Sequence, residues 1–123
     1  MKRTNLEEMT VDQLVDRFAS ICLDQDQALL YSNIAKFNRL FKQMRATDDE
    51  LKSRPGDQRR ALLALYTHPN AQVRLQAARA SLAVAPDAGR SLIETIASSR
   101  KYPQAGDAGM TLDALDQGIF KPT

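Results

Sequence analysis

The chain contains one histidine and one cysteine, side chains that commonly act as bases, nucleophiles or metal ligands near neutral pH. His68 stands beside Pro69 in an expected turn, and no second histidine or neighbouring cysteine could share a metal ion with it. We therefore expect His68 to form local hydrogen bonds. Cys22 lies on an apolar stripe, where a free thiol behaves as a small buried hydrophobic group. Neither residue predicts catalysis.

Carboxylates are the other groups that could act as acids, bases or metal ligands. They occur in clusters at Glu7-Glu8, Asp12 and Asp16, Asp24 and Asp26, and Asp48-Asp49-Glu50. Most lie near expected helix starts, where the helix dipole favours negative charge. The segment around Asp24 lacks the glycine and the closing glutamate of a calcium loop. Since the sequence also lacks a phosphate-binding glycine loop, a nucleophile elbow and paired cysteines, we expect no catalytic residue, metal site or cofactor.

Basic side chains are concentrated in the middle of the chain, although 17 basic and 15 acidic residues give a net charge of only +2. Such a cluster could line a groove that contacts nucleic-acid phosphates. Few aromatic residues accompany it for stacking on bases, Tyr66 and Tyr102 being the two candidates. We expect a solvated face and keep nucleic-acid binding as the alternative function. The possible binding surface comprises Arg59, Arg60, Arg79, Arg90, Arg100 and Lys101.

Arg74 has the most specific predicted environment among the basic residues. On a helix it falls on a mostly apolar arc with Val73 and Ala77, because successive residues are rotated by about 100°. The neighbouring polar sector contains Gln72, Gln76 and Arg79. A buried guanidinium without a partner is costly, so an acidic or carbonyl group must face it. We predict an inter-helix ion pair with Asp107 or Asp57.

The elements expected to carry these residues are helices. Thr10 and Gln13 form a capping box before a first amphipathic helix. After a break at Asp24-Gln25-Asp26, a longer helix is expected, and Asp48 to Glu50 either continue it or begin a short helical turn. Its predicted buried stripe comprises Leu29, Leu30, Ile34, Phe37, Leu40, Phe41 and Met44. The segment 53–57, with its Pro-Gly pair, ends this helix.

The second half of the chain is expected to begin with a helical hairpin, with helices over residues 57–66 and 71–84. Pro69 disfavours a helical residue before it, and Asn70 can cap the next helix. A helix capped by Asp87 and a last helix over residues 107–116, ended by Gly118, follow. Ile119 and Phe120 are expected to fold back on the body. Since no segment alternates as a strand does, the fold is predicted to be all-α with about six helices.

A resemblance to known repeats is carried by Asn70, Val73, Arg74, Ala77, Ala78 and Leu82, whose spacing is similar to the second-helix signature of HEAT and armadillo repeats. Residues 87–115 can be laid over 57–82 as another helical pair. The whole chain, including its ending QAGDAGMTLDALDQGIFKPT, resembles a small bacterial family known only as a domain of unknown function with a HEAT-like superhelix. The resemblance implies a short α-α superhelix and no activity.

A single domain over residues 1–123 is expected, because 43% hydrophobic residues suffice for one core. No apolar run reaches the ~20 residues of a membrane span, and the polar start from Met1 to Arg3 does not lead into a signal peptide. With one cysteine, this favours a cytoplasmic protein without a membrane partner. We predict a non-enzymatic helical scaffold that binds another protein. The wide apolar stripe of residues 29–44 leaves a homodimer open.

Overall fold

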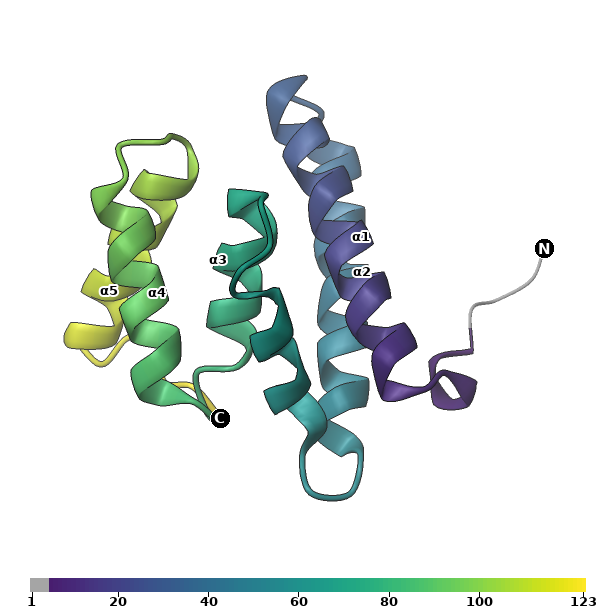
Figure 1. Ribbon diagram of the computed structural model, residues 1–123. Coiled ribbons are helices and arrows are strands. Elements are labelled where there is room, and N and C mark those ends of the chain that lie inside the picture. The colour runs from purple at the N-terminus through teal and green to yellow at the C-terminus, as the bar shows by residue number, and fades with distance from the viewer. Residues whose placement is uncertain (1–4) are drawn as a thin grey trace. The chain divides into compact units, whose positions relative to one another are not determined.

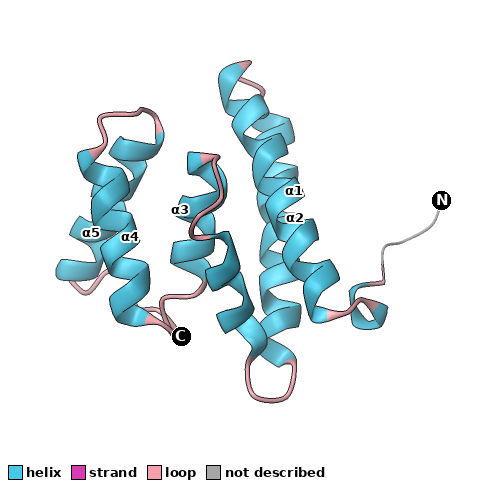
Figure 2. Cartoon of the chain, viewed as in Figure 1, coloured by secondary structure: helices cyan, strands magenta, loops and turns pink. Residues whose placement is uncertain are grey.

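The computed structural model describes residues 5–123, and the N-terminal residues considered for a signal peptide lie outside this range. All regular structure in the described range is helical, in five α-helices and two 3-10 helices, and the prediction of an all-α fold is confirmed (Figure 2). The chain divides into two compact units, a first unit ending at Ala61 and a second unit from Leu62 to Thr123. The single domain and the superhelix stay predictions.

The first unit is a helical hairpin preceded by a short 3-10 helix, η1 (Leu6–Glu8). Its two helices, α1 (Val11–Leu30) and α2 (Ile34–Ser53), each contain 20 residues and pack side by side (Figure 1). The predicted capping box is confirmed, since the Thr10 side chain accepts the amide of Gln13 at 3.1 Å and the Gln13 side chain accepts the amide of Thr10 at 2.9 Å.

The turn between α1 and α2 lies at residues 31–33. Ser32 adopts a left-handed conformation with φ 53°, and the amide of Asn33 donates to the carbonyl of Ala28 at 2.8 Å. The amide of Ser32 donates to the carbonyl of Leu29 at 3.2 Å, which completes a Schellman ending of α1. The side chain of Asn33 then accepts the amide of Lys36 at 3.1 Å and caps α2.

The predicted break at Asp24-Gln25-Asp26 is wrong, because α1 runs through it. Aspartate costs a helix interior only a few tenths of a kcal/mol, up to about 0.7, relative to alanine. Gln25 is fully buried on the inner face of α1, and its amide donates to the sulfur of Met44 at 3.5 Å. Packing of the hairpin therefore outweighs the weak local preference.

The core of the first unit only partly matches the predicted stripe. Leu40 and Met44 are buried as predicted, but Leu30 and Ile34 are 75% and 71% exposed. The stripe was drawn along one continuous helix, whereas the turn separates Leu30 on α1 from Ile34 on α2. The buried positions of the two helices are Leu14, Val15, Phe18, Ile21, Cys22, Gln25, Ala28, Leu40, Met44, Thr47, Asp48 and Leu51.

The end of α2 and the start of the next element follow the sequence signals with one difference. α2 continues through Asp48 to Ser53, the first of the two alternatives, and the loop after it contains Gly56 at φ 79°. The predicted helix over residues 57–66 is instead a 3-10 helix, η2 (Gln58–Leu65), within which the boundary between the units falls.

The second unit contains three α-helices: α3 (Ala71–Ala80), α4 (Pro86–Ser98) and α5 (Gln104–Asp116). The Asn70 side chain accepts the amide of Val73 at 3.1 Å, which confirms the predicted cap. The predicted Asp87 cap is wrong, because α4 begins at Pro86, two residues before the start that such a cap implies, and Ala85 occupies the cap position. The missing N–H of Pro86 needs no partner at the start of a helix. α5 begins three residues before its predicted start, and Gly118 follows it at φ 70°.

The core of the second unit is a cluster of Leu75, Ala78, Leu82, Ile93, Ile96 and Ala108. Phe120 packs against this cluster, whereas Ile119 is 74% exposed, so the tail folds back through one of its two predicted residues. Gly89 marks a close approach, because a Cβ atom there would lie 2.9 Å from a methyl carbon of Leu82 and 3.1 Å from the carbonyl oxygen of Ala78.

Candidate functional site

Exposed apolar side chains gather around the turn of the first unit. Leu30, Tyr31 and Ile34 are 75%, 78% and 71% exposed, and Leu29 and Phe41 are each more than a third exposed. We call these five residues the tip patch. Single exposed apolar residues are common on proteins, but a contiguous group marks a surface suited to binding. The tip patch is therefore the leading candidate site.

The tip patch extends along α2. Ile34, Phe37 and Phe41 are spaced three and four residues apart, which places them on one stripe of the helix. Phe37 is half-buried, and the stripe flanks the buried positions Leu40 and Met44. Another element can therefore lie along this stripe.

The charges on the same part of α2 are all positive. Its first three turns carry Lys36, Arg39, Lys42 and Arg45 without one acidic residue. Within residues 5–123, none of Lys36, Arg39 and Lys42 forms an ion pair. Of the four basic residues, Lys42 and Arg45 lie beside the apolar stripe, because successive residues are rotated by about 100°, whereas Lys36 and Arg39 lie on other sides of the helix.

The exposed carboxylates of α1 have no ion-pair partner in the described range either. Asp12, Asp16 and Asp24 are exposed, and the half-buried Arg17 is the one basic residue of this helix. The hairpin therefore carries an acidic outer face on α1 and a basic beginning on α2.

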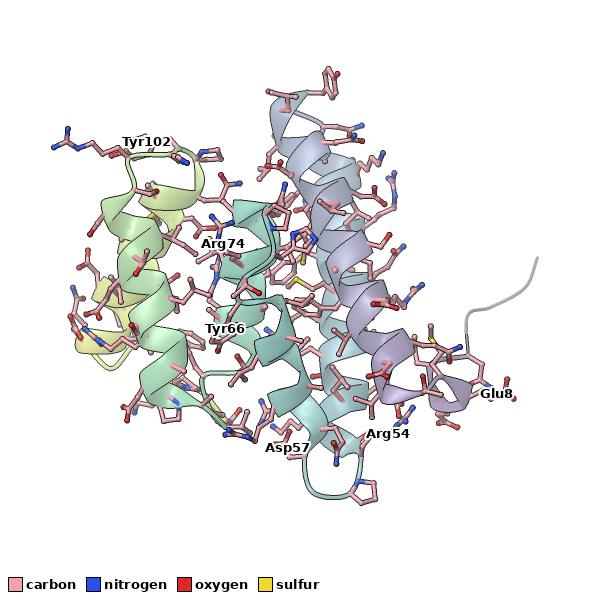
Figure 3. All side chains as sticks on the ribbon, in the orientation of Figure 1. Glu8, Arg54, Asp57, Tyr66, Arg74 and Tyr102 are labelled. Atoms are coloured by element: carbon pink, nitrogen blue, oxygen red, sulfur yellow. The ribbon has the colours of Figure 1, made fainter. Side chains whose placement is uncertain are left out.

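Arg54 serves the fold at the base of the hairpin. Its Nε lies 2.6 Å from Oε2 of Glu50, and its Nη2 donates to the carbonyls of Met9 at 2.7 Å and Leu6 at 3.0 Å. Figure 3 shows Arg54 beside the 3-10 turn that carries Glu8. The Arg54 guanidinium is thus already hydrogen-bonded, and it stabilises the N-terminal turn.

A second group of charges is buried in the first unit. Arg59 donates from Nη2 to Oδ2 of Asp57 at 2.7 Å and from Nε to Oδ1 at 2.9 Å, and this pairing raises the pKa of Arg59 and lowers that of Asp57. Asp48 is buried with its Oδ1 unbonded. Loss of hydration raises its pKa to about 6, against the opposing charge of Arg59. Sequence reasoning missed this site, because Asp48 stands in an acidic run typical of exposed helix.

Three of the six residues of the predicted basic surface form ion pairs within their own unit. Arg59 is buried on Asp57, Arg79 pairs with Asp107 at 2.6 Å, and Arg90 contacts Asp116 at 2.9 Å. Arg100 and Lys101 are exposed, as is Arg60. Since Arg59 and Arg60 belong to the first unit and the other four residues to the second, nucleic-acid binding through them stays a prediction.

The predicted ion pair of Arg74 is wrong. Its Nη1 donates to the carbonyl of His68 at 2.7 Å, while Asp107 and Asp57 are occupied by other arginines. Helical side chains point back toward the helix N-terminus, so Arg74 reaches the turn before α3 (Figure 3). The Nδ1 of His68 accepts the amide of Asn70 at 3.0 Å, which confirms the prediction of a locally bonded turn histidine.

The polar sector predicted on α3 is buried. Gln72 and Gln76 are 2% and 4% exposed, and the Gln104 side chain donates to that of Gln72 at 3.0 Å. Tyr66 and Ser81 share a hydrogen bond of 2.5 Å between their hydroxyls. The other predicted structural residues, Val73, Ala77 and Leu82, are buried too. Several buried or half-buried polar side chains of the second unit are therefore paired inside it, among them Gln72, Gln104, Tyr66 and Ser81.

Cys22 is fully buried, with its sulfur 3.8 Å from that of Met44, as its place on the apolar stripe predicts. No three histidine, cysteine, aspartate or glutamate side chains from Asn5 onward are grouped to hold a metal ion. Likewise, none of the helices in that range is long and apolar enough to cross a membrane.

Comparisons with known proteins give a family and a fold. Residues 12–116 match a family model described as a domain of unknown function (DUF2019). The chain is similar to the crystal structure of the protein RPA1889 from Rhodopseudomonas palustris CGA009, with 55% sequence identity and a TM-score of 0.94 over 98% of this chain and 100% of that one. Among curated proteins, none matches the chain.

Proposed function

Because the chain belongs to the DUF2019 family, whose description names no activity, we propose from its own surface that it is a non-enzymatic helical scaffold that binds another protein through the tip patch. The HEAT-like stacking of its helices and a cytoplasmic location are part of this proposal. A buried thiol with no disulfide suits a reducing compartment.

The observation that carries the proposal is the exposure of the tip patch. Leu30, Tyr31 and Ile34 lie within five consecutive positions and are each more than 70% exposed. Large apolar side chains in such a group lose free energy when a partner removes them from water, by about 25 cal/mol per Å² of apolar surface. A tyrosine at the centre suits an interface, since its ring is apolar and its hydroxyl can form a hydrogen bond.

The environments of the two reactive residue types support a non-enzymatic role. The imidazole of His68 holds the turn before α3 through its Nδ1, and its carbonyl holds Arg74. The thiol of Cys22 is enclosed in the hairpin core. A substrate would have to displace packing or hydrogen bonds to reach either group.

Affinity capture tests the proposal. The tagged chain is incubated with native bacterial lysate beside a tip variant carrying Leu30→Glu and Ile34→Glu. Proteins retained by the chain, identified by mass spectrometry, are expected to be absent from the tip variant, since two buried glutamates would oppose association.

A control variant carries Tyr102→Glu and Met110→Glu, which change two second-unit side chains of equal exposure, 72% and 71%. It is expected to retain the same proteins as the unchanged chain, and circular dichroism confirms that all three fold. Capture that is equal for the tip variant would refute the proposal. Recovery of the chain alone would also contradict it, since that result indicates a self-contained oligomer.

A further inference from the structure

The stripe of Ile34, Phe37 and Phe41 has the form of a helix-binding seam. It spans two turns of α2, about 10 Å at 1.5 Å per residue, and continues into Leu29 and Leu30 at the end of α1. Apolar positions repeated at intervals of three and four on an exposed helix face are what a second amphipathic helix packs against.

The charge beside this seam selects the chemistry of its partner. At about 100° per residue, Lys42 and Arg45 lie beside the seam on the circumference of α2, and neither has an ion pair in the described residues. Lys36 and Arg39 lie on other sides of the helix. Opposite charges on a partner would steer it to this surface and fix its register. A partner with basic residues at its rim would be repelled.

We propose that the tip patch and its basic rim bind an acidic amphipathic helix of another protein, laid along α2 with its apolar face on Ile34, Phe37 and Phe41. This inference rests on the proposed function and names the kind of segment that the partner supplies. The apolar seam provides the buried area, and Lys42 and Arg45 pair with glutamates or aspartates at the edge of the bound helix.

A second copy of the chain is a poorer occupant of this surface. A two-fold axis would place one tip patch against another, because both subunits of such a dimer use the same surface. Each copy would then bring Lys42 and Arg45 to the shared interface with no carboxylate from the first three turns of α2 to pair with them, and like charges at an interface oppose association.

An anionic membrane is also a poorer occupant. Basic clusters that bind anionic lipids contain about four to eight lysines or arginines on one surface, whereas two, Lys42 and Arg45, lie beside the seam. The seam also extends from the turn along the first two turns of α2.

A display library gives the direct test. Peptides of about 16 residues, or four helical turns, carry leucine at helical spacing and random Asp, Glu, Lys, Arg, Gln or Ser elsewhere. Selection on the full chain is expected to enrich peptides with a net negative charge. Their affinity, measured by fluorescence anisotropy, is expected to fall as NaCl is raised, because salt screens the charged rim.

Variants locate the bound peptide. Ile34→Glu is expected to weaken the best acidic peptide by about tenfold or more, since it places a charge in the seam. Lys42→Glu is expected to weaken it less and to improve binding of a matched peptide in which two glutamates are lysines. Met110→Glu and Lys101→Glu change side chains of similar exposure in the second unit and should leave the affinity unchanged.

The inference would be overturned by enriched peptides with no negative charge, by affinities insensitive to Ile34→Glu, or by a concentration-dependent dimer of the chain that Ile34→Glu abolishes. Sedimentation of the chain with phosphatidylserine vesicles, lost in Ile34→Glu, would overturn it in favour of a membrane. If proteins captured from lysate still depend on the tip patch, only this inference fails. If the tip variant captures the same proteins as the unchanged chain, the proposed function fails as well.

Discussion

The two units of the chain differ in the reach of their ion pairs and in the large apolar side chains that they expose. Exposed charges without an ion pair occur in both, for example Lys42 in the first unit and Lys101 in the second. In the second unit, the ion pairs of Arg79 with Asp107 and Arg90 with Asp116 join partners distant in sequence, and Gln104 bonds to Gln72 inside the fold. In the first unit, six large apolar side chains are exposed, and several charges of α1 and α2 have no ion pair in residues 5–123. The second unit exposes three large apolar side chains, Tyr102, Met110 and Ile119.

This difference separates side chains that stabilise the protein from side chains free to bind. A polar group that is already paired inside a unit gains little from a ligand, because the existing bond must break first. An exposed apolar group or an unpaired charge has no such cost. The second unit is therefore interpreted as a self-contained structural part, and the first unit as the part that offers a binding surface.

The largest expected effect tests how tightly the second unit is packed. Gly89→Ala is expected to lower the free energy of unfolding by about 3 kcal/mol, because the new methyl group would press on Leu82 and the backbone of Ala78. Chemical denaturation measures this loss. The matched control is Gly109→Ala on α5, where a Cβ would meet nothing within 4 Å. Gly109→Ala should stabilise the protein by about 0.5–1 kcal/mol through helix propensity. Equal effects of the two substitutions would contradict the close packing at Gly89.

A smaller effect concerns the buried charge of the first unit. The pKa of Asp48 rises from 3.8 to about 6 on folding, so its ionised form opposes folding. This penalty is absent below pH 3.8, grows as the pH rises toward 6 and is complete above it. Asp48→Asn is therefore expected to raise the free energy of unfolding by about 2 kcal/mol at neutral pH.

Thermal melts at a series of pH values check this prediction. The advantage of Asp48→Asn should shrink as the pH falls from about 7 to 4, because the native aspartate then becomes neutral. Asp49→Asn alters the exposed neighbour and should change little at any pH. A constant difference between Asp48→Asn and the native chain across this range would show that the carboxyl does not titrate in the fold.

The smallest of these effects belongs to Arg74. Arg74→Met keeps the apolar stem but removes the donor to the carbonyl of His68, and a loss of about 1 kcal/mol is expected. The melting temperature measures it, with Arg100→Met, at an exposed turn position, as the control. An unchanged melting temperature in Arg74→Met would mean that the turn before α3 needs no such support.

Local signals allowed much of the fold to be predicted. The capping box at Thr10, the cap at Asn70 and the helix end at Gly118 depend on chemistry within a few residues, and all three are confirmed. The turn at Ser32 has no such signal, because a serine at positive φ looks like any other serine in sequence. Because the break between the helices was predicted at residues 24–26 instead, Leu30 and Ile34 were expected in the core, although both are exposed.

The candidate site could not be predicted for the same reason. Whether an apolar residue is core or surface depends on where a helix ends, and Leu30 and Ile34 became exposed only when the turn was placed between them. The burial of Asp48 and the hydrogen bond from Arg74 to the carbonyl of His68 both depend on tertiary packing. The sequence contains the types of residue that a binding surface needs. Packing, ion pairs and hydrogen bonds of the folded chain determine which of these side chains remain exposed for binding.

The most direct test of the comparison is an NMR titration of the isotope-labelled chain with the tightest acidic peptide from the library. The account predicts that amide shifts concentrate in residues 29–45, at the end of α1 and the beginning of α2, and that α4 and α5 stay unchanged. Shifts centred on α3, α4 or α5, or spread evenly along the chain, would contradict it.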